Sequence, residues 1–124
     1  MKNADTPYLN TIRIYICQGQ KVPNTSFWKR FLGDNLLSTA LLRRAKEAGL
    51  RQAFMLPVKA GFLGDARLVF GVMEINPPDL PVCIEIIDDP GKIRLFITEN
   101  RNLLASAFAV TENTETYRVV SRPD

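Results

Sequence analysis

Residues 80–88, LPVCIEIID, form the most pronounced strand pattern in the chain, and they limit its possible folds more than any other stretch. Apolar side chains occupy both odd and even positions, so a strand here presents apolar groups on both faces. The two faces carry Val82, Ile84 and Ile86 on one side and Cys83, Glu85 and Ile87 on the other. Residues 9–17, LNTIRIYIC, alternate in the same way and predict a second such strand.

Two amphipathic helices are predicted, one between these strands and one after them. The first covers residues 34–50, with Asp34 or Asn35 as its cap and Gly49 as its left-handed stop, where Leu50 folds back. Its buried stripe consists of Leu37, Leu41, Ala45 and Ala48. The second helix starts at Pro90, with Asp88 or Asp89 as its cap. Its buried stripe consists of Ile93, Phe96, Ile97 and Leu104.

The other strands are predicted from short apolar runs between breakers. Residues 51–59 form a strand, and Pro57, which cannot donate a ladder hydrogen bond, marks it as an edge strand or marks the strand's end. Residues 68–75 form a strand before the NPPD turn, and residues 105–111 and 116–120 supply one or two short final strands.

The order of elements is strand, helix, strand, long loop, strand, helix, strand. This βαββαβ order predicts an α+β, ferredoxin-like fold: an antiparallel sheet with both helices on one face and the first and third strands at its centre. The 124 residues suit a single domain, residues 1–124. Within it, residues 1–9 are predicted to be flexible and residues 18–34 to form an irregular insertion with a helical turn capped by Thr25 or Ser26.

The second face of this sheet is predicted to be too apolar to stay in water. It carries Tyr15, Ile87 and either Phe54 or Met55, and another copy of the chain is the economical cover. Arg13 and Glu85 share that face and are expected to form a partly buried ion pair at a subunit contact. The oligomer-interface candidates are Arg13, Tyr15, Glu85 and Ile87.

The absence of histidine excludes Ser-His and Cys-His nucleophile systems and any histidine metal site. The sequence also has no Walker loop, dinucleotide fingerprint or Cys-x-x-Cys motif. We therefore predict a protein that is not an enzyme, with no catalytic residue, no metal and no cofactor.

Charge and hydropathy point to an intracellular chain. The net charge of +3 favours anionic partners but is too small to predict nucleic-acid binding, and the basic run at positions 43, 44 and 46 is interpreted as a solvated helix face. No apolar run reaches the roughly 18 residues that span a bilayer, and no secretory signal follows Met1. A cytoplasmic protein without direct membrane insertion is expected, with Cys17 and Cys83 as reduced thiols.

The loop KAGFLGDARL, residues 59–68, is the best candidate for a binding site. Gly61 and Gly64 permit positive φ, so consecutive amides can form an anion-binding nest flanked by Lys59 and Arg67. Phe62 could cover a bound base. The alternative is a mobile hairpin without a binding role, whose charged side chains make it soluble.

Several stretches resemble an uncharacterised PII-like family, a domain of unknown function related to nitrogen-regulatory PII signalling proteins. They are RIYI, LSTALLRRAKEAGL, AFML, GFLG and LPVCIEIIDDPGKI, and the likeness extends over residues 11–120. The resemblance implies a ferredoxin-like homotrimer, in which the loop between strands two and three is the T-loop and small effectors bind in clefts between subunits. It also adds Lys92 and Arg101 as candidates that could reach a neighbouring cleft.

Three features depart from this family pattern. Residues 21–33 look like an insertion, no histidine follows Arg67, and Pro57-Val58 replaces an Arg-Gly pair. The inserted aromatic residues Phe27, Trp28 and Phe31 are either a lid over the core or a docking surface.

Three functional hypotheses follow. The first is a non-enzymatic PII-like regulator that binds a small anionic effector, an adenine nucleotide, and acts through its T-loop on a protein partner such as a membrane transporter or an enzyme. The second is a structural or docking trimer without a ligand. The third is a small-molecule enzyme on a ferredoxin-like fold, for which Asp65 is the only carboxylate within the loop.

Overall fold

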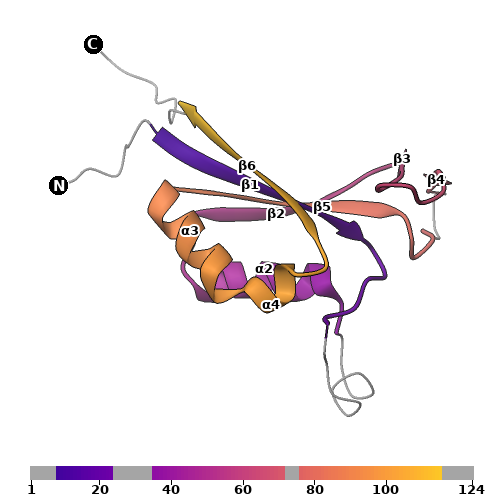
Figure 1. The fold of residues 1–124 in the computed structure, drawn as a ribbon, viewed down its shortest axis with the longest axis horizontal. Coiled ribbons are helices and arrows are strands. Elements are labelled where there is room, and N and C mark those ends of the chain that lie inside the picture. The colour runs from indigo at the N-terminus through magenta and orange to yellow at the C-terminus, as the bar shows by residue number, and fades with distance from the viewer. Residues whose placement is uncertain (1–7, 24–34, 72–75, 116–124) are drawn as a thin grey trace, which may run out of the picture.

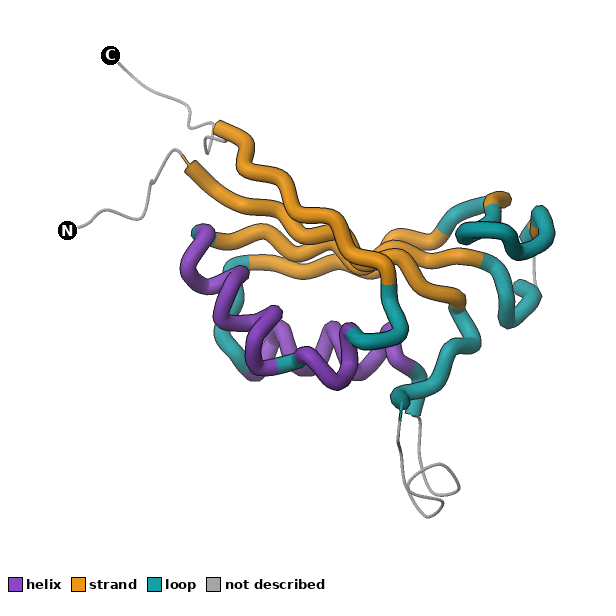
Figure 2. Tube along the Cα trace, viewed as in Figure 1, coloured by secondary structure: helices purple, strands orange, loops and turns teal. Residues whose placement is uncertain are grey.

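The computed structural model describes residues 8–23, 35–71 and 76–115. Its main sheet has four antiparallel strands in the order β2-β5-β1-β6, and a two-stranded hairpin, β3–β4, extends from one end (Figure 1). The strands are β1 (Tyr8–Cys17), β2 (Gln52–Pro57), β3 (Ala60–Gly61), β4 (Val69–Phe70), β5 (Pro81–Asp88) and β6 (Phe108–Glu115). The helices are α2 (Leu37–Glu47), α3 (Pro90–Glu99) and α4 (Arg101–Leu104), and all three lie on one face of the sheet (Figure 2).

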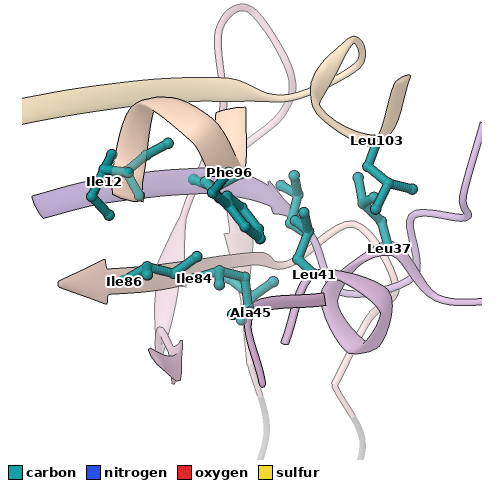
Figure 3. Close-up of a cluster of buried hydrophobic side chains, with 12 residues drawn as sticks. Ile12, Leu37, Leu41, Ala45, Ile84, Ile86, Phe96 and Leu103 are labelled. Carbon is teal, nitrogen blue, oxygen red and sulfur yellow. The ribbon is translucent and has the colours of Figure 1, made fainter. Parts of the chain in front are cut away.

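The centre of the sheet is the pair of strands with the strongest sequence patterns. β1 pairs with β5 so that Ile12 faces Ile86 and Ile14 faces Ile84. These side chains point toward the helices and form the core, because burying apolar surface is the main force that holds a helix layer on a sheet (Figure 3). The core consists of Ile12, Ile14, Ile16, Leu37, Leu41, Ala45, Val82, Ile84, Ile86, Ile93, Phe96 and Leu103. The predicted ferredoxin-like fold is confirmed.

Helix α2 ends as predicted but begins differently. Gly49 has φ +73°, and the Leu50 amide reaches back to the Ala45 carbonyl at 3.1 Å. The predicted cap at Asn35 is wrong: the cap position is Leu36, whose side chain makes no cap hydrogen bond, while Asn35 is buried. The predicted burial of Ala48 is also wrong. The helix ends at Glu47, and Ala48, its C-cap, is exposed.

Helix α3 begins at Pro90, as predicted, and Asp89 is its cap. The Asp89 Oδ1 atom accepts a hydrogen bond from the Lys92 amide at 3.4 Å. The helix ends at Glu99 with Asn100 as its C-cap, and a separate short helix, α4, follows. Because of this break, Leu103 is buried in the core in place of the predicted Leu104, which packs at the margin of the core.

The edges of the sheet are partly as predicted. β2 is an edge strand that ends at Pro57, and within residues 68–71, the described part of the predicted strand 68–75, residues 69–70 are paired. β6 continues beyond residue 111 through the polar run ENTE, which the sequence analysis did not assign to a strand.

Some predictions lie outside the described residues. These are the structure of residues 1–7, the capping role of Asp34, the inserted aromatic residues at 27, 28 and 31, the helical turn at 25–26, residues 72–75 and the final strand at 116–120. In the described part of the chain, no helix is long and apolar enough to cross a membrane.

Candidate functional site

The glycine-containing loop forms an ordered hairpin next to the end of the main sheet. Ala60 pairs with Phe70 and Gly61 with Val69, and the Gly71 amide donates to the Lys59 carbonyl at 2.7 Å. Gly64 lies in the turn with φ +57°, which favours glycine. The prediction of positive φ is wrong for Gly61, because β3 pairing holds that residue in an extended conformation. Only Gly64 therefore supplies the left-handed geometry that an amide nest requires.

Arg67, the strongest anion-binding candidate in this hairpin, forms an ion pair that the sequence analysis missed. Its Nε and Nη2 atoms donate to the two carboxylate oxygens of Asp79 at 2.9 and 3.2 Å. Asp79 lies in the NPPD turn just before β5, so this pair connects the loop between β3 and β4 to that turn. The Arg67 side chain is 68% exposed and that of Asp79 is 42% exposed, and solvent therefore weakens the attraction.

The hairpin also presents an apolar surface, which we define as Phe62, Leu68 and Phe70. All three side chains are more than half exposed, and Lys59 beside them is exposed as well. An exposed cluster of large apolar side chains is typical of a contact surface.

A second candidate region is the sheet face opposite the helices, here called the open face. In the described part of the chain no helix covers it (Figures 1 and 2). The strand registers place on it Tyr15, Phe54, Leu56, Ile87, Phe108 and Val110. The register also decides the alternative left open above, since Met55 pairs with Ile84 and so lies on the helix side. The tyrosine and Phe108 rings lie 6.5 Å apart between centroids.

An ion cluster stands in the middle of the open face. The Arg13 Nε atom donates to Glu85 Oε2 at 3.1 Å, which confirms the predicted ion pair, and Nη1 donates to Glu112 at 2.5 Å. These hydrogen bonds, that to Glu112 first and that to Glu85 second, raise the pKa of the guanidinium. Glu112 was missed, although extending the alternation of β6 beyond Val110 would have found it. With two carboxylates and one cation, the cluster has a formal charge of −1.

The two cysteines share the open face but are offset along it. Cys83 lies opposite Tyr15, and Cys17 lies opposite Pro81. Burial is the main cause that raises the pKa of both thiols, and nearby carboxylates add to it. Both groups are therefore protonated near neutral pH and are weak nucleophiles.

Lys92 lies apart from the hairpin within one chain. The hairpin precedes β5, and Lys92 follows it in the first turn of α3. Eight residues of extended strand span about 26 Å, so one small ligand cannot contact both ends of β5 in a single chain. Arg101 is the first residue of α4 and is exposed. Among the described residues, no group of three or more Cys, Asp and Glu side chains could hold a metal ion.

Comparison with known proteins identifies the family. Two solved structures with similar folds are of CPII, a nitrogen regulatory PII-like protein from Thiomonas intermedia K12, one bound to ADP, AMP and bicarbonate and the other to ADP and bicarbonate. They have 14% and 12% sequence identity, TM-scores of 0.56 and 0.55, and 90% coverage of both chains in each case. No curated protein matches the chain. The model of the DUF190 family, described as "Uncharacterized ACR", matches residues 10–116. The chain therefore belongs to the DUF190 family and has a PII-like, ferredoxin-like fold.

Proposed function

We propose that this chain is a PII-like regulator that binds a small anionic effector, an adenine nucleotide, in clefts between the subunits of a homotrimer. In this proposal it catalyses no reaction. It acts on a partner protein, such as a membrane transporter or an enzyme, through the segment between β2 and β5, which corresponds to the T-loop.

The geometry of Arg67 is the observation that carries effector binding. Its guanidinium directs two N–H groups at two oxygens of one carboxylate, and the same fork suits two oxygens of a phosphate. Asp79 occupies that fork here, so a nucleotide phosphate would compete with it. The CPII structures, which have a similar fold, contain ADP.

The placement of the cationic candidates supports a site between chains. Lys92 and the hairpin lie at opposite ends of β5, so a ligand that contacts both must bind between two copies. The open face supports assembly, because large apolar side chains such as Phe54 and Phe108 are exposed on it. The apolar surface of the hairpin would then remain available for a partner protein.

Isothermal titration of the chain with ADP, with and without bicarbonate, tests the proposal. We expect Arg67→Ala to weaken ADP binding by about tenfold to a hundredfold, the usual effect of losing a charge-assisted hydrogen bond. Asp79→Asn should strengthen binding, since it removes the competing carboxylate charge.

The matched control is Arg94→Ala, which removes an exposed arginine from the outer side of α3. It should bind ADP as the parent does. If the parent shows no saturable binding of ADP or AMP, the effector hypothesis is wrong, and a trimer without a ligand is the better description.

A further inference from the structure

The NPPD turn, which carries Asp79, is attached to the residues that follow β1. The Gln18 amide donates to the Leu80 carbonyl at 2.9 Å. The Gly19 amide donates to the Pro78 carbonyl at 2.8 Å. Asp79 lies between the two accepting residues, so its backbone is held on both sides.

Gly19 comes closer to this turn than a side chain would allow. A Cβ atom built on Gly19 would lie 2.6 Å from the Cβ atom of Pro78 and 3.2 Å from both its Cα atom and its carbonyl oxygen. Non-bonded carbon atoms pack best at about 3.5–4.0 Å, and ring and backbone atoms cannot rotate away, so even an alanine here must push the turn outward. The φ angle of Gly19 lies outside the left-handed region. The close contact, and not the backbone conformation, therefore requires glycine at this position.

The far end of the turn is anchored in the molecule. Leu80 is 1% exposed, and its amide closes the turn by donating to the Pro77 carbonyl at 3.0 Å. Pro78, in contrast, is exposed. A push from Gly19 therefore moves the outer part of the turn while Leu80 stays in place, and the Asp79 backbone moves with the outer part.

The ion pair depends on this placement, because two oxygens of one carboxylate must meet two N–H groups of one guanidinium, at 2.9 and 3.2 Å. We propose that Gly19 is a positioning residue of the effector site, an inference that rests on the function proposed above. Its contact with Pro78 holds the Asp79 carboxylate on Arg67, so that the arginine stays occupied until an effector phosphate displaces the carboxylate. The end of β1 thus sets how strongly the protein competes with its own effector.

The Nε–H signal of Arg67, recorded by NMR on the full ¹⁵N-labelled chain without ligand, tests the contact directly. We expect Gly19→Ala to shift this signal in the same direction as Asp79→Asn, and to accelerate its exchange with water by about twofold to fivefold, the range of an exposed ion pair. Gly91→Ala is the matched control, since a Cβ atom there has ordinary room, with Asp89 Oδ1 at 3.7 Å, and it should leave the signal unchanged. An unchanged Arg67 signal in Gly19→Ala would overturn the proposal.

Calorimetric titration with ADP separates this role from a merely structural one. Gly19→Ala and Asp79→Asn should each strengthen ADP binding by about twofold to fivefold, because both release Arg67 from an exposed ion pair. The double variant should bind no more tightly than either single variant, since both changes remove the same competitor. General damage to the site would weaken binding, so weaker binding by Gly19→Ala, or gains that multiply in the double variant, would contradict the proposal.

Two further results keep the test decisive. If Gly19→Ala does not fold, Pro78→Gly removes the same contact from the exposed side without placing an atom in a tight space, and it should shift the Arg67 signal in the same way. An unchanged signal in Pro78→Gly would refute the role of Gly19. A parent that does not bind ADP would refute the effector function, and the Arg67 signal without ligand would then decide the role of Gly19 by itself.

Discussion

Asp88 shows what a single buried carboxylate does in this fold. It is 2% exposed, and its two oxygens accept hydrogen bonds from the amides of Arg51 and Asp89, both at 2.7 Å. One side chain thus ties the first residue before β2 to the end of β5 and to the start of α3. This gives a structural reason for the aspartate in the stretch LPVCIEIID.

Replacing this residue by Asp88→Asn should lower the free energy of unfolding by about 1–3 kcal/mol. An amide offers one acceptor oxygen and one donor NH₂ group, so one of the two backbone N–H groups loses its acceptor. Urea denaturation measures the change. The control is Asp89→Asn, which should change stability little because asparagine caps a helix as well as aspartate does. Equal effects of the two substitutions would contradict this account of Asp88.

The buried thiols predict how stability depends on pH. The pKa of Cys83 is raised above its usual value of 9.0 in the folded chain, chiefly by burial, so the folded state keeps a proton that the unfolded state releases. The stabilising contribution is therefore complete below pH 9 and is lost as the pH rises through the folded-state pKa.

Urea denaturation of the parent and of Cys83→Ala at pH 7, 9 and 10 tests this pH dependence. Above pH 9, the unfolding free energy of the parent should fall relative to that of the variant. Other titrating groups are present in both proteins, so their effects cancel in the comparison. A difference that stays constant with pH would show that the thiol titrates normally.

At the scale of elements, the hairpin depends on one backbone angle. Gly64 has φ +57°, and no heavy atom of the described residues lies within 4 Å of a Cβ built there. A side chain at this position is therefore disfavoured by backbone conformation and not by steric contact. The cost of placing an ordinary L-residue in this region is about 1–2 kcal/mol.

Gly64→Ala should loosen the hairpin without unfolding the sheet. We expect hydrogen exchange of the Gly71 amide, which bonds to the Lys59 carbonyl, to accelerate by about fivefold to thirtyfold, since that range corresponds to 1–2 kcal/mol. Gly64→Asn should exchange more slowly than the alanine variant, because asparagine tolerates this conformation. Unchanged exchange in the alanine variant would mean that the turn does not control the hairpin.

The elements also show what the sequence can and cannot predict. Strands β1 and β5 were found because each lies between two other strands and most of its side chains are buried. Buried positions are apolar, so the strand pattern can be recognised in the sequence. The run ENTE in β6 was missed because four consecutive polar residues carry no such period; its pairing with β1 defines it. The partner of Arg67 was missed because Asp79 is twelve residues away in the sequence. The local residue pattern does not show that the chain brings these two side chains together.

At the scale of the whole molecule, the open face predicts assembly. It holds aromatic side chains such as Phe108, which is 69% exposed, around an ion cluster that contact with another subunit would desolvate. In residues 8–23, 35–71 and 76–115, the helices bury one side of the sheet and leave the other side uncovered.

Light scattering after size exclusion should report a trimer at micromolar concentration, with three times the chain mass of 14.0 kDa. Phe108→Glu should shift the chain toward monomer, because it places an extra negative charge beside a cluster that is already at −1. The control is Leu95→Glu, an equally drastic change at a 55% exposed leucine on α3, on the opposite side of the sheet, and it should leave the trimer intact. A monomeric parent would refute the assembly.

The pairing of β1 with β5 and β6 has a consequence for synthesis of the chain. β1 is made first, and its two neighbours in the sheet end 71 and 98 residues later. At about 5–20 residues per second, the isoleucines of β1 wait on the order of 4–20 s for their permanent partners. During that interval β1 is an apolar segment without its partner strands. The nascent chain is therefore prone to aggregate at this stage, and a chaperone at the ribosome exit would bind this segment.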